Sequence, residues 1–193
     1  YNLEKINFLK ILNFILSYLD SGNVVLKKRD EVEILIISNI VSIDNLKKDL
    51  YFGNLDKSLN KKKIKTIKAF RNFTYKKSSE LSKIMKNDNI IFSKRLNYLA
   101  ELKFACLIFK EILVFIFLNK YRYIKKYIKL RDLFSIASNL RLVSQIEEVI
   151  KVIKPKIIIF TYEGHAWERL LVNLCKTKYK SINTIGYQFS TIK

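Results

Sequence analysis

The sequence KPKIIIFTYEGHAWERLLVNLCKTKYKSINTIG, residues 154–186, changes its hydrophobic period twice. Residues 157–160 form a continuous apolar run, which is typical of a parallel strand covered on both faces. From Trp167 onward, apolar residues recur at i, i+3, i+4, i+7 and i+8, which predicts a helix over about residues 165–176. Residues 181–185 then predict a strand that ends at Gly186. This order of elements predicts a right-handed βαβ unit and an α/β fold.

Hydrophobic patterning extends the prediction to the rest of the chain. Pro155 ends the helix that precedes the first of these strands, because proline disfavours helical geometry in the residue before it. The other predicted elements are a helix over residues 142–153, strands over 32–37 and 90–92, an amphipathic helix over 3–19, a helix or a strand over 64–73, and a solvated connection over 44–63. No repeat or linker divides the chain, so we expect residues 1–193 to form one domain.

The most apolar stretch is FACLIFKEILVFIFL, residues 104–118. Its composition suggests a membrane span, but Lys110 and Glu111 lie in its middle, and it is shorter than the roughly 20 residues that a spanning helix needs. We therefore predict a buried core helix. The basic and aromatic residues that follow, with Tyr121, Tyr123 and Tyr127, predict a patch that contacts a membrane surface.

The formal net charge is +20, from 30 Lys and 7 Arg against 17 acidic residues. Such a charge attracts phosphate in nucleic acid, anionic lipid or nucleotide-activated substrates. The excess of Lys over Arg argues against nucleic acid, whose recognition favours Arg, and matches an AT-rich codon bias that also raises Ile and Asn. Cys106 and Cys175 show no metal-ligand spacing, so we expect no metal site and a reduced, cytosolic setting.

Chemically useful side chains gather at the loop after the strand at 157–160. Ligands of an open parallel sheet bind at the carboxyl ends of its strands. Glu163 is placed to act as a general base on a hydroxyl group, and His165 to share its proton or bind a phosphate. Each also has a structural explanation: the helix dipole favours an acidic residue there, and a lone His can satisfy a loop carbonyl. The substrate-binding candidates in this loop are Tyr162, Gly164, Glu168 and Arg169, the last two of which could equally form a structural ion pair.

The segments KPKIIIFTYEGHAWERLL (154–171) and INTIGYQFS (182–190) together resemble the N-terminal half of a family of bacterial surface-carbohydrate biosynthesis proteins, glycosyltransferase-like enzymes of the GT-B fold. In that family one strand ends in an acidic loop of the type Tyr-Glu-Gly/Asn-X-X-Trp-Glu, and the next ends in Gly-Tyr-Gln-His-Ser. The resemblance matches Glu163 to the acidic position at the interdomain cleft. It departs at Phe189, where the family usually has His. The second loop adds the substrate-binding candidates Gly186, Tyr187, Gln188 and Ser190.

The resemblance implies that residues 1–193 are a single Rossmann-like, acceptor-side domain, a fragment of a longer two-domain enzyme that would be inactive alone. Such an enzyme transfers a sugar from a nucleotide-sugar donor to a surface polysaccharide or lipid-linked glycan, without a further cofactor. Its expected location is cytoplasmic, at the inner face of the cell membrane, with the anionic membrane surface as a partner. Two alternatives remain open at this point: a basic membrane- or nucleic-acid-binding module without catalysis, and a GT-B-like sugar-nucleotide epimerase.

Overall fold

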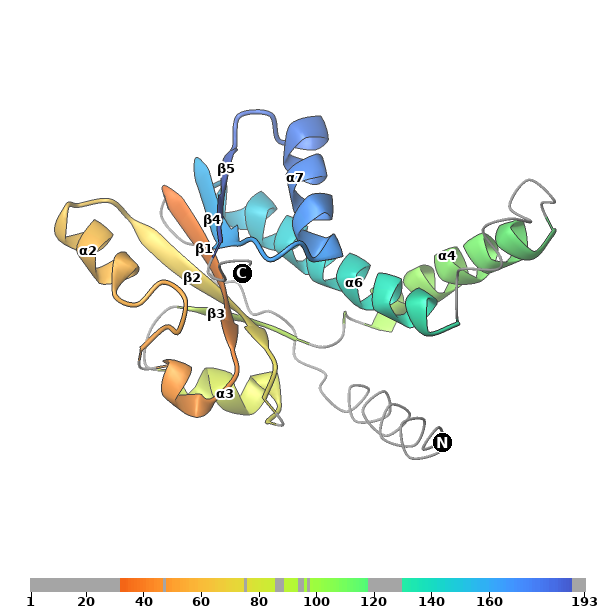
Figure 1. The fold of residues 1–193 in the computed structure, drawn as a ribbon, viewed down its shortest axis with the longest axis horizontal. Helices are drawn as coiled ribbons and strands as arrows, with labels where there is room; N and C mark the ends of the chain where they lie inside the picture. Colours follow the sequence, from red (N-terminus) through yellow and green to blue (C-terminus); the bar gives the residue numbers. More distant parts are fainter. Residues whose placement is uncertain are drawn as a thin grey trace, which may run out of the picture.

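The computed structural model describes residues 32–46, 48–74, 76–85, 89–93, 96, 98–117 and 130–188. These residues form a five-stranded, all-parallel sheet flanked by helices (Figure 1). The strand order is β3-β2-β1-β4-β5, with β1 (Ile34–Ile40) at the centre, β2 (Thr66–Asn72) and β3 (Ile90–Phe92) on one side, and β4 (Ile157–Thr161) and β5 (Asn183–Tyr187) on the other. The predicted α/β class, with a Rossmann-like sheet, is confirmed.

One face of the sheet packs against α6 (Leu130–Ile153) and α7 (Ala166–Lys178). The main core lies here and joins alternate residues of the strands to the inner faces of both helices. Ile37, Ile158 and Phe160 of the sheet meet Ile146 of α6 and Trp167 of α7, and each is at most 1% exposed. Burying apolar side chains of this size contributes about 1.5–3 kcal/mol each. This core sets the position of the first turn of α7 above the end of β4.

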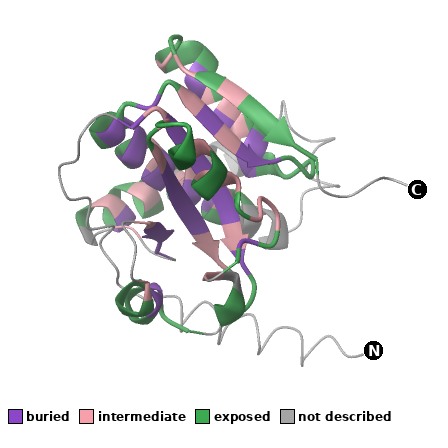
Figure 2. Ribbon diagram, turned by 90° about the vertical axis from the view of Figure 1, so that its left-hand side faces the viewer, coloured by how far each residue is buried: buried purple, intermediate pink, exposed green. Residues whose placement is uncertain are grey.

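The opposite face carries α2 (Leu55–Lys61) and α3 (Ser78–Ile84), as Figure 1 shows. A smaller apolar cluster forms there from Ile40, Phe70, Leu81 and Ile91. Figure 2 shows the buried residues concentrated in the central strands and on the inner sides of the helices, while β5 at the sheet edge is mostly exposed. The sheet is therefore covered on both faces at its centre, as the continuous apolar runs of its strands predict.

Several element boundaries differ from the predicted ones. The strand predicted at 32–37 extends over Ile34–Ile40, the helix predicted at 142–153 starts earlier, at Leu130, and the strand predicted at 181–185 is shifted to Asn183–Tyr187. The segment 64–73, compatible with either a helix or a strand, contains β2. The connection at 44–63 is not simply solvated, because it contains a 3-10 turn (Ile43–Leu46), α2 and the buried Asp49.

For the side chains that the structure describes, the prediction of a buried core helix over 104–118 is wrong. The helix α4 (Tyr98–Phe117) extends away from the sheet (Figure 1). Its apolar residues Leu99, Leu102, Phe109 and Leu113 are 69%, 53%, 63% and 38% exposed. Among the described side chains, Glu101 pairs with Arg141 of α6, whose guanidinium carbon also lies 5.2 Å from the centroid of the Phe104 ring. The apolar composition of this stretch predicted burial. Composition alone could not show whether other described residues cover these side chains.

None of the described helices is both long enough and apolar enough to cross a membrane. The predicted helix at 3–19, the patch with Tyr121, Tyr123 and Tyr127, and the loop residues Phe189 and Ser190 lie outside the described residues.

Candidate functional site

The candidate site lies at the carboxyl edge of the sheet, near the point between β1 and β4 where the strand order reverses. From β1 the chain continues to β2 and β3 on one side, whereas β4 and β5 lie on the other side. Connections therefore leave the carboxyl ends of β1 and β4 in opposite directions. In open α/β sheets such a switch point opens a crevice that binds ligands.

The two segments singled out from the sequence meet at this edge, but Gly186 and Tyr187, predicted to begin a loop, are the last two residues of β5. The backbone N–H of Tyr162, after β4, donates to the carbonyl of Tyr187 at the end of β5, at 2.8 Å. Gly186 packs directly on Tyr162: a Cβ at position 186 would lie 3.0 Å from the Tyr162 Cβ and 3.2 Å from its Cγ. Gly186 therefore permits the close approach of the two loops.

The loop after β4 is held by the buried carboxylate of Glu168. Both of its oxygens accept the backbone N–H of Glu163 at 3.1 Å, and Oε2 also accepts the N–H of His165 at 2.8 Å. Between these residues Gly164 has φ +82°, which a residue with a side chain adopts only with strain. The Arg169 guanidinium donates to the Gly164 carbonyl at 3.3 Å. The backbone of the whole turn is therefore fixed by the first turn of α7.

This arrangement divides the predicted site residues into two groups. Glu163 and His165, the predicted catalytic residues, have exposed side chains on the loop. Tyr162, Gly164, Arg169, Tyr187 and Gln188 are also exposed. Glu168 instead is 0% exposed, with its carboxylate turned to loop N–H groups, so its position is that of a scaffold for the loop. No ion pair forms between Glu168 and Arg169 in the described structure.

A third loop, which follows β1, reaches the same edge from the other face. Asp49 Oδ1 accepts the hydroxyl of Ser38 at 2.8 Å and the backbone N–H groups of Tyr51 and Phe52 at 2.9 and 3.1 Å. The buried ammonium of Lys68 lies 3.4 Å from Asp49 Oδ2 and 2.9 Å from Asp56 Oδ1. Because buried ions need partners of opposite charge, these ion pairs hold the loop on the sheet.

Arg71, near the end of β2, was not among the predicted site residues. Its side chain faces α7, and its guanidinium carbon lies 4.8 Å from the ring centroid of Trp167 and 4.8 Å from that of Phe73. Burial lowers the pKa of this guanidinium to about 10, while the negative charge of Glu168 and, to a lesser extent, Tyr51 act in the opposite direction. Arg71 therefore remains charged at neutral pH, in a desolvated position at the carboxyl edge.

Two uncharged polar groups complete this part of the site. Asn39 is the residue of β1 that pairs with Arg71 across the β1–β2 ladder. Its Oδ1 atom and the Nε1 atom of Trp167 are both buried and have no hydrogen-bond partner among the described residues. Unpaired polar atoms of this kind are uncommon in folded proteins, and each costs free energy unless a ligand or water satisfies it.

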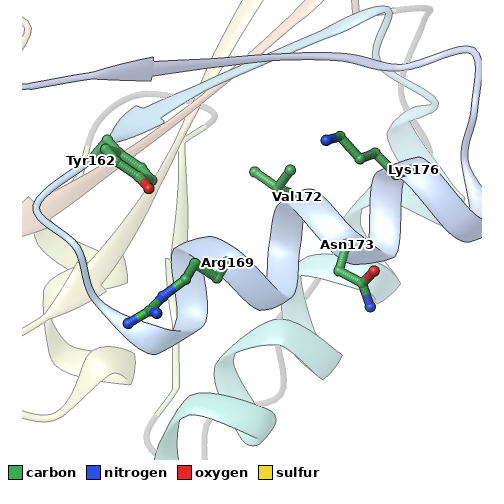
Figure 3. A pocket seen from close by; sticks show the side chains of 5 residues that line it. All are labelled: Tyr162, Arg169, Val172, Asn173 and Lys176. Carbon is green, nitrogen blue, oxygen red and sulfur yellow. The ribbon is translucent and has the colours of Figure 1, made fainter.

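A shallow cavity of about 220 Å³ lies on the outer side of the loop after β4. Figure 3 shows Tyr162 on the strand side and the other lining residues, Arg169, Val172, Asn173 and Lys176, along α7. The cavity is small compared with the 300–1,000 Å³ of ligand pockets. The cavity is therefore a surface depression beside the loop and not an enclosed binding site. No group of three or more His, Cys, Asp or Glu side chains is placed to hold a metal ion in the described part of the chain.

The sequence did not point to Arg71 or to the Asp49–Lys68 cluster because no definite structure was predicted for 44–63 or 64–73, and Asn39 was missed because the predicted strand ended at residue 37. A signal for Arg71 was present. It is one of only 7 Arg in a Lys-rich chain, and aromatic residues stand at positions 70 and 73. Arg stacks on aromatic rings and binds oxyanions in a planar, bidentate manner, so an Arg between aromatic residues in such a background is a candidate for a binding role.

The described structure thus belongs to the class of α/β proteins with a Rossmann-like sheet. We compared the chain with models of protein families, with curated protein sequences and with solved structures, and none of the three comparisons found a match.

Proposed function

We propose that this chain is the acceptor-side domain of a glycosyltransferase that moves a sugar from a nucleotide donor to a glycan or lipid-linked acceptor. Glu163 removes the proton from the acceptor hydroxyl, and the oxygen then attacks the anomeric carbon of the donor as the nucleoside diphosphate leaves. His165 and Arg169 provide hydrogen bonds and positive charge beside this carboxylate. The donor is held mainly by a second domain, as the resemblance to GT-B enzymes implies.

The observation that supports this proposal is the fixed backbone beneath an exposed carboxylate. Glu168 accepts the N–H groups of both Glu163 and His165, so the turn between them is rigid although their side chains face solvent. A general base needs such positioning, because catalysis depends on holding the base within hydrogen-bond reach of the proton that it removes. The loop also lies at the carboxyl edge of a parallel sheet, where ligands of this fold class bind.

The test is a transfer assay with the full-length protein, a panel of nucleotide sugars and a lipid extract as acceptor, read as release of the nucleoside diphosphate. Glu163→Gln should lower kcat by about a hundredfold or more, the contribution of a general base. Glu148→Gln, on the exposed side of α6, is the matched control and should retain full activity. Undiminished transfer by Glu163→Gln would exclude Glu163 as the base, and no release from any donor by the wild type would exclude the function.

A second proposed property, attachment to the membrane surface, is supported by α4. Leu99, Leu102, Phe109 and Leu113 follow helical spacing along one exposed side, with Lys103 and Lys110 next to them. A helix with an apolar stripe and flanking lysines suits the boundary between anionic headgroups and acyl chains. An enzyme with a lipid-linked acceptor would gain from being held there.

This property can be measured by co-sedimentation with vesicles of phosphatidylglycerol and phosphatidylcholine. Phe109→Asp should weaken binding by about tenfold, because it places a charge in the apolar stripe that enters the membrane surface. Val152→Asp, which changes an exposed apolar residue of α6, is the control and should bind as the wild type does. Equal binding by all three proteins, or none by the wild type, would overturn the role of α4.

A further inference from the structure

The carboxyl edge of the sheet contains a positive charge without a close partner. The Arg71 side chain forms no ion pair or hydrogen bond with any of the described residues, and its guanidinium makes its close contacts with the rings of Phe73 and Trp167. Removing a charge from water costs several kcal/mol unless a counter-charge lies close by. Stacking between aromatic rings offsets only part of that cost, about 0.5–2 kcal/mol. The five N–H donors of the guanidinium need acceptors that the surrounding side chains do not supply.

Glu168 does not provide that acceptor. Its negative charge acts on Arg71, but its two oxygens accept the N–H groups of the loop after β4, and no ion pair with Arg71 forms. The unpaired polar atoms Asn39 Oδ1 and Trp167 Nε1 belong to two of Arg71's immediate neighbours. Arg71 and Asn39 are both only partly buried, so solvent and ligands reach them.

We propose that Arg71 is the centre of a phosphate-binding site at the switch point of the sheet. The guanidinium donates two parallel hydrogen bonds to oxygens of the phosphate, a geometry that Arg favours over Lys. The indole N–H of Trp167 is a further donor next to the guanidinium, available to the same group. Asn39 Oδ1 is an acceptor, so it would receive a hydrogen bond from a water bound beside the phosphate and not from the phosphate itself. This site does not depend on sugar transfer, since its residues are separate from Glu163 and His165.

Trp167 provides a specific reporter, because it is the only Trp in the chain and lies against Arg71. The experiment records the indole N–H resonance of the ¹⁵N-labelled chain during titration at constant ionic strength with inorganic phosphate, glucose 1-phosphate or acetate. Phosphate should shift the resonance saturably with a Kd in the millimolar range, about 4 kcal/mol of binding free energy. Acetate should bind at least about tenfold more weakly, since it carries less charge.

Three variants locate the site. Arg71→Gln should raise the phosphate Kd by about tenfold or more. Arg71→Lys keeps the positive charge but loses the paired N–H donors of the guanidinium, so it should raise the Kd by a smaller factor. Lys151→Gln removes an exposed positive charge on α6 and should leave the Kd within about twofold, because exposed charges are screened. Thermal melts of each variant establish that it is folded, and Arg71→Lys keeps the test valid if Arg71→Gln unfolds.

The titrations distinguish two sources of the phosphate group, a phosphate ester and the free anion. Tighter binding of glucose 1-phosphate than of inorganic phosphate identifies a phosphate ester as the ligand, whereas equal binding identifies the free anion; both support the site. A resonance that phosphate does not shift, a shift that is unchanged in both Arg71 variants, or equal affinity for acetate would overturn it.

Discussion

The ring of Phe52 lies 5.6 Å from the ring of Tyr187, measured between their centroids. Phe52 belongs to the loop after β1 and Tyr187 to the last position of β5, so the contact bridges the carboxyl end of β4, which lies between the two strands. Together with the Tyr162–Tyr187 hydrogen bond, this contact joins the loop after β1, the loop after β4 and the end of β5 along the carboxyl edge. The stability of this edge depends on the groups that hold each segment.

Lys68 holds the first of these loops. Replacing it by Met would leave the carboxylates of Asp49 and Asp56 without their cation, and we expect the free energy of unfolding to fall by about 3 kcal/mol. Urea denaturation measures the loss. Lys65→Met, just before β2 and exposed, is the control and should change stability by less than about 0.5 kcal/mol. Equal stability of the two variants would show that the cluster is not structural.

Glu168 holds the second loop. In Glu168→Ala the N–H groups of Glu163 and His165 lose their acceptor, so we expect a loss of about 2–4 kcal/mol in unfolding free energy. Glu168→Gln keeps one acceptor oxygen and should lose less. Glu148→Ala tests the removal of an exposed carboxylate from α6. If Glu168→Ala denatures at the same urea concentration as Glu148→Ala, the proposed anchoring is wrong.

Gly186 allows the third contact. The methyl group of Gly186→Ala would meet the Tyr162 Cβ at 3.0 Å, so we expect a destabilisation of about 1–3 kcal/mol. Combining it with Tyr162→Gly removes the atoms that clash. The double variant should therefore be more stable than the sum of the two single losses predicts, and strictly additive losses would argue against the contact.

Burial raises the pKa of the Cys175 thiol from 9.0 to about 11, whereas Cys106 is exposed. Because the folded state keeps the Cys175 proton more tightly, its contribution to stability is complete below about pH 9 and is lost as the pH rises toward about 11. At pH 8 we expect a thiol reagent to modify Cys106 rapidly and Cys175 only after unfolding. Urea denaturation at pH 8 and pH 10 should show a smaller loss in Cys175→Ala than in the wild type. Rapid modification of both thiols in the native protein would contradict this expectation.

The sequence predicted the β4–α7–β5 unit best, because a change of hydrophobic period reports directly on strand and helix geometry. It left β2 undecided because the apolar residues of 64–73 recur at a helix-like step of three while its threonines also allow a strand. Lys68 adds to the ambiguity, since its burial is explained only by its partners Asp49 and Asp56. The burial of that lysine is a tertiary property, which no local pattern contains.

The candidate site was predicted only in part for a similar reason. The loop with Glu163 and His165 stood out by composition within a single segment. Arg71 and Trp167, by contrast, are almost a hundred positions apart. They meet only because α7 packs on the face of the sheet to which the Arg71 side chain points. For α4 the error had the opposite origin: its apolar residues were read as core, although the fold leaves them exposed.

The pairing of β1 also bears on how the protein is made. Ile34 of β1 pairs with Ile157 of β4, more than a hundred residues further along the chain. During synthesis the apolar segment ILIISNI therefore emerges long before the strand that covers one of its edges. An uncovered, apolar strand edge is a site of self-association. Nascent chains are consequently most vulnerable to aggregation before β4 emerges from the ribosome, and chaperones that shield this edge should raise the yield of folded protein.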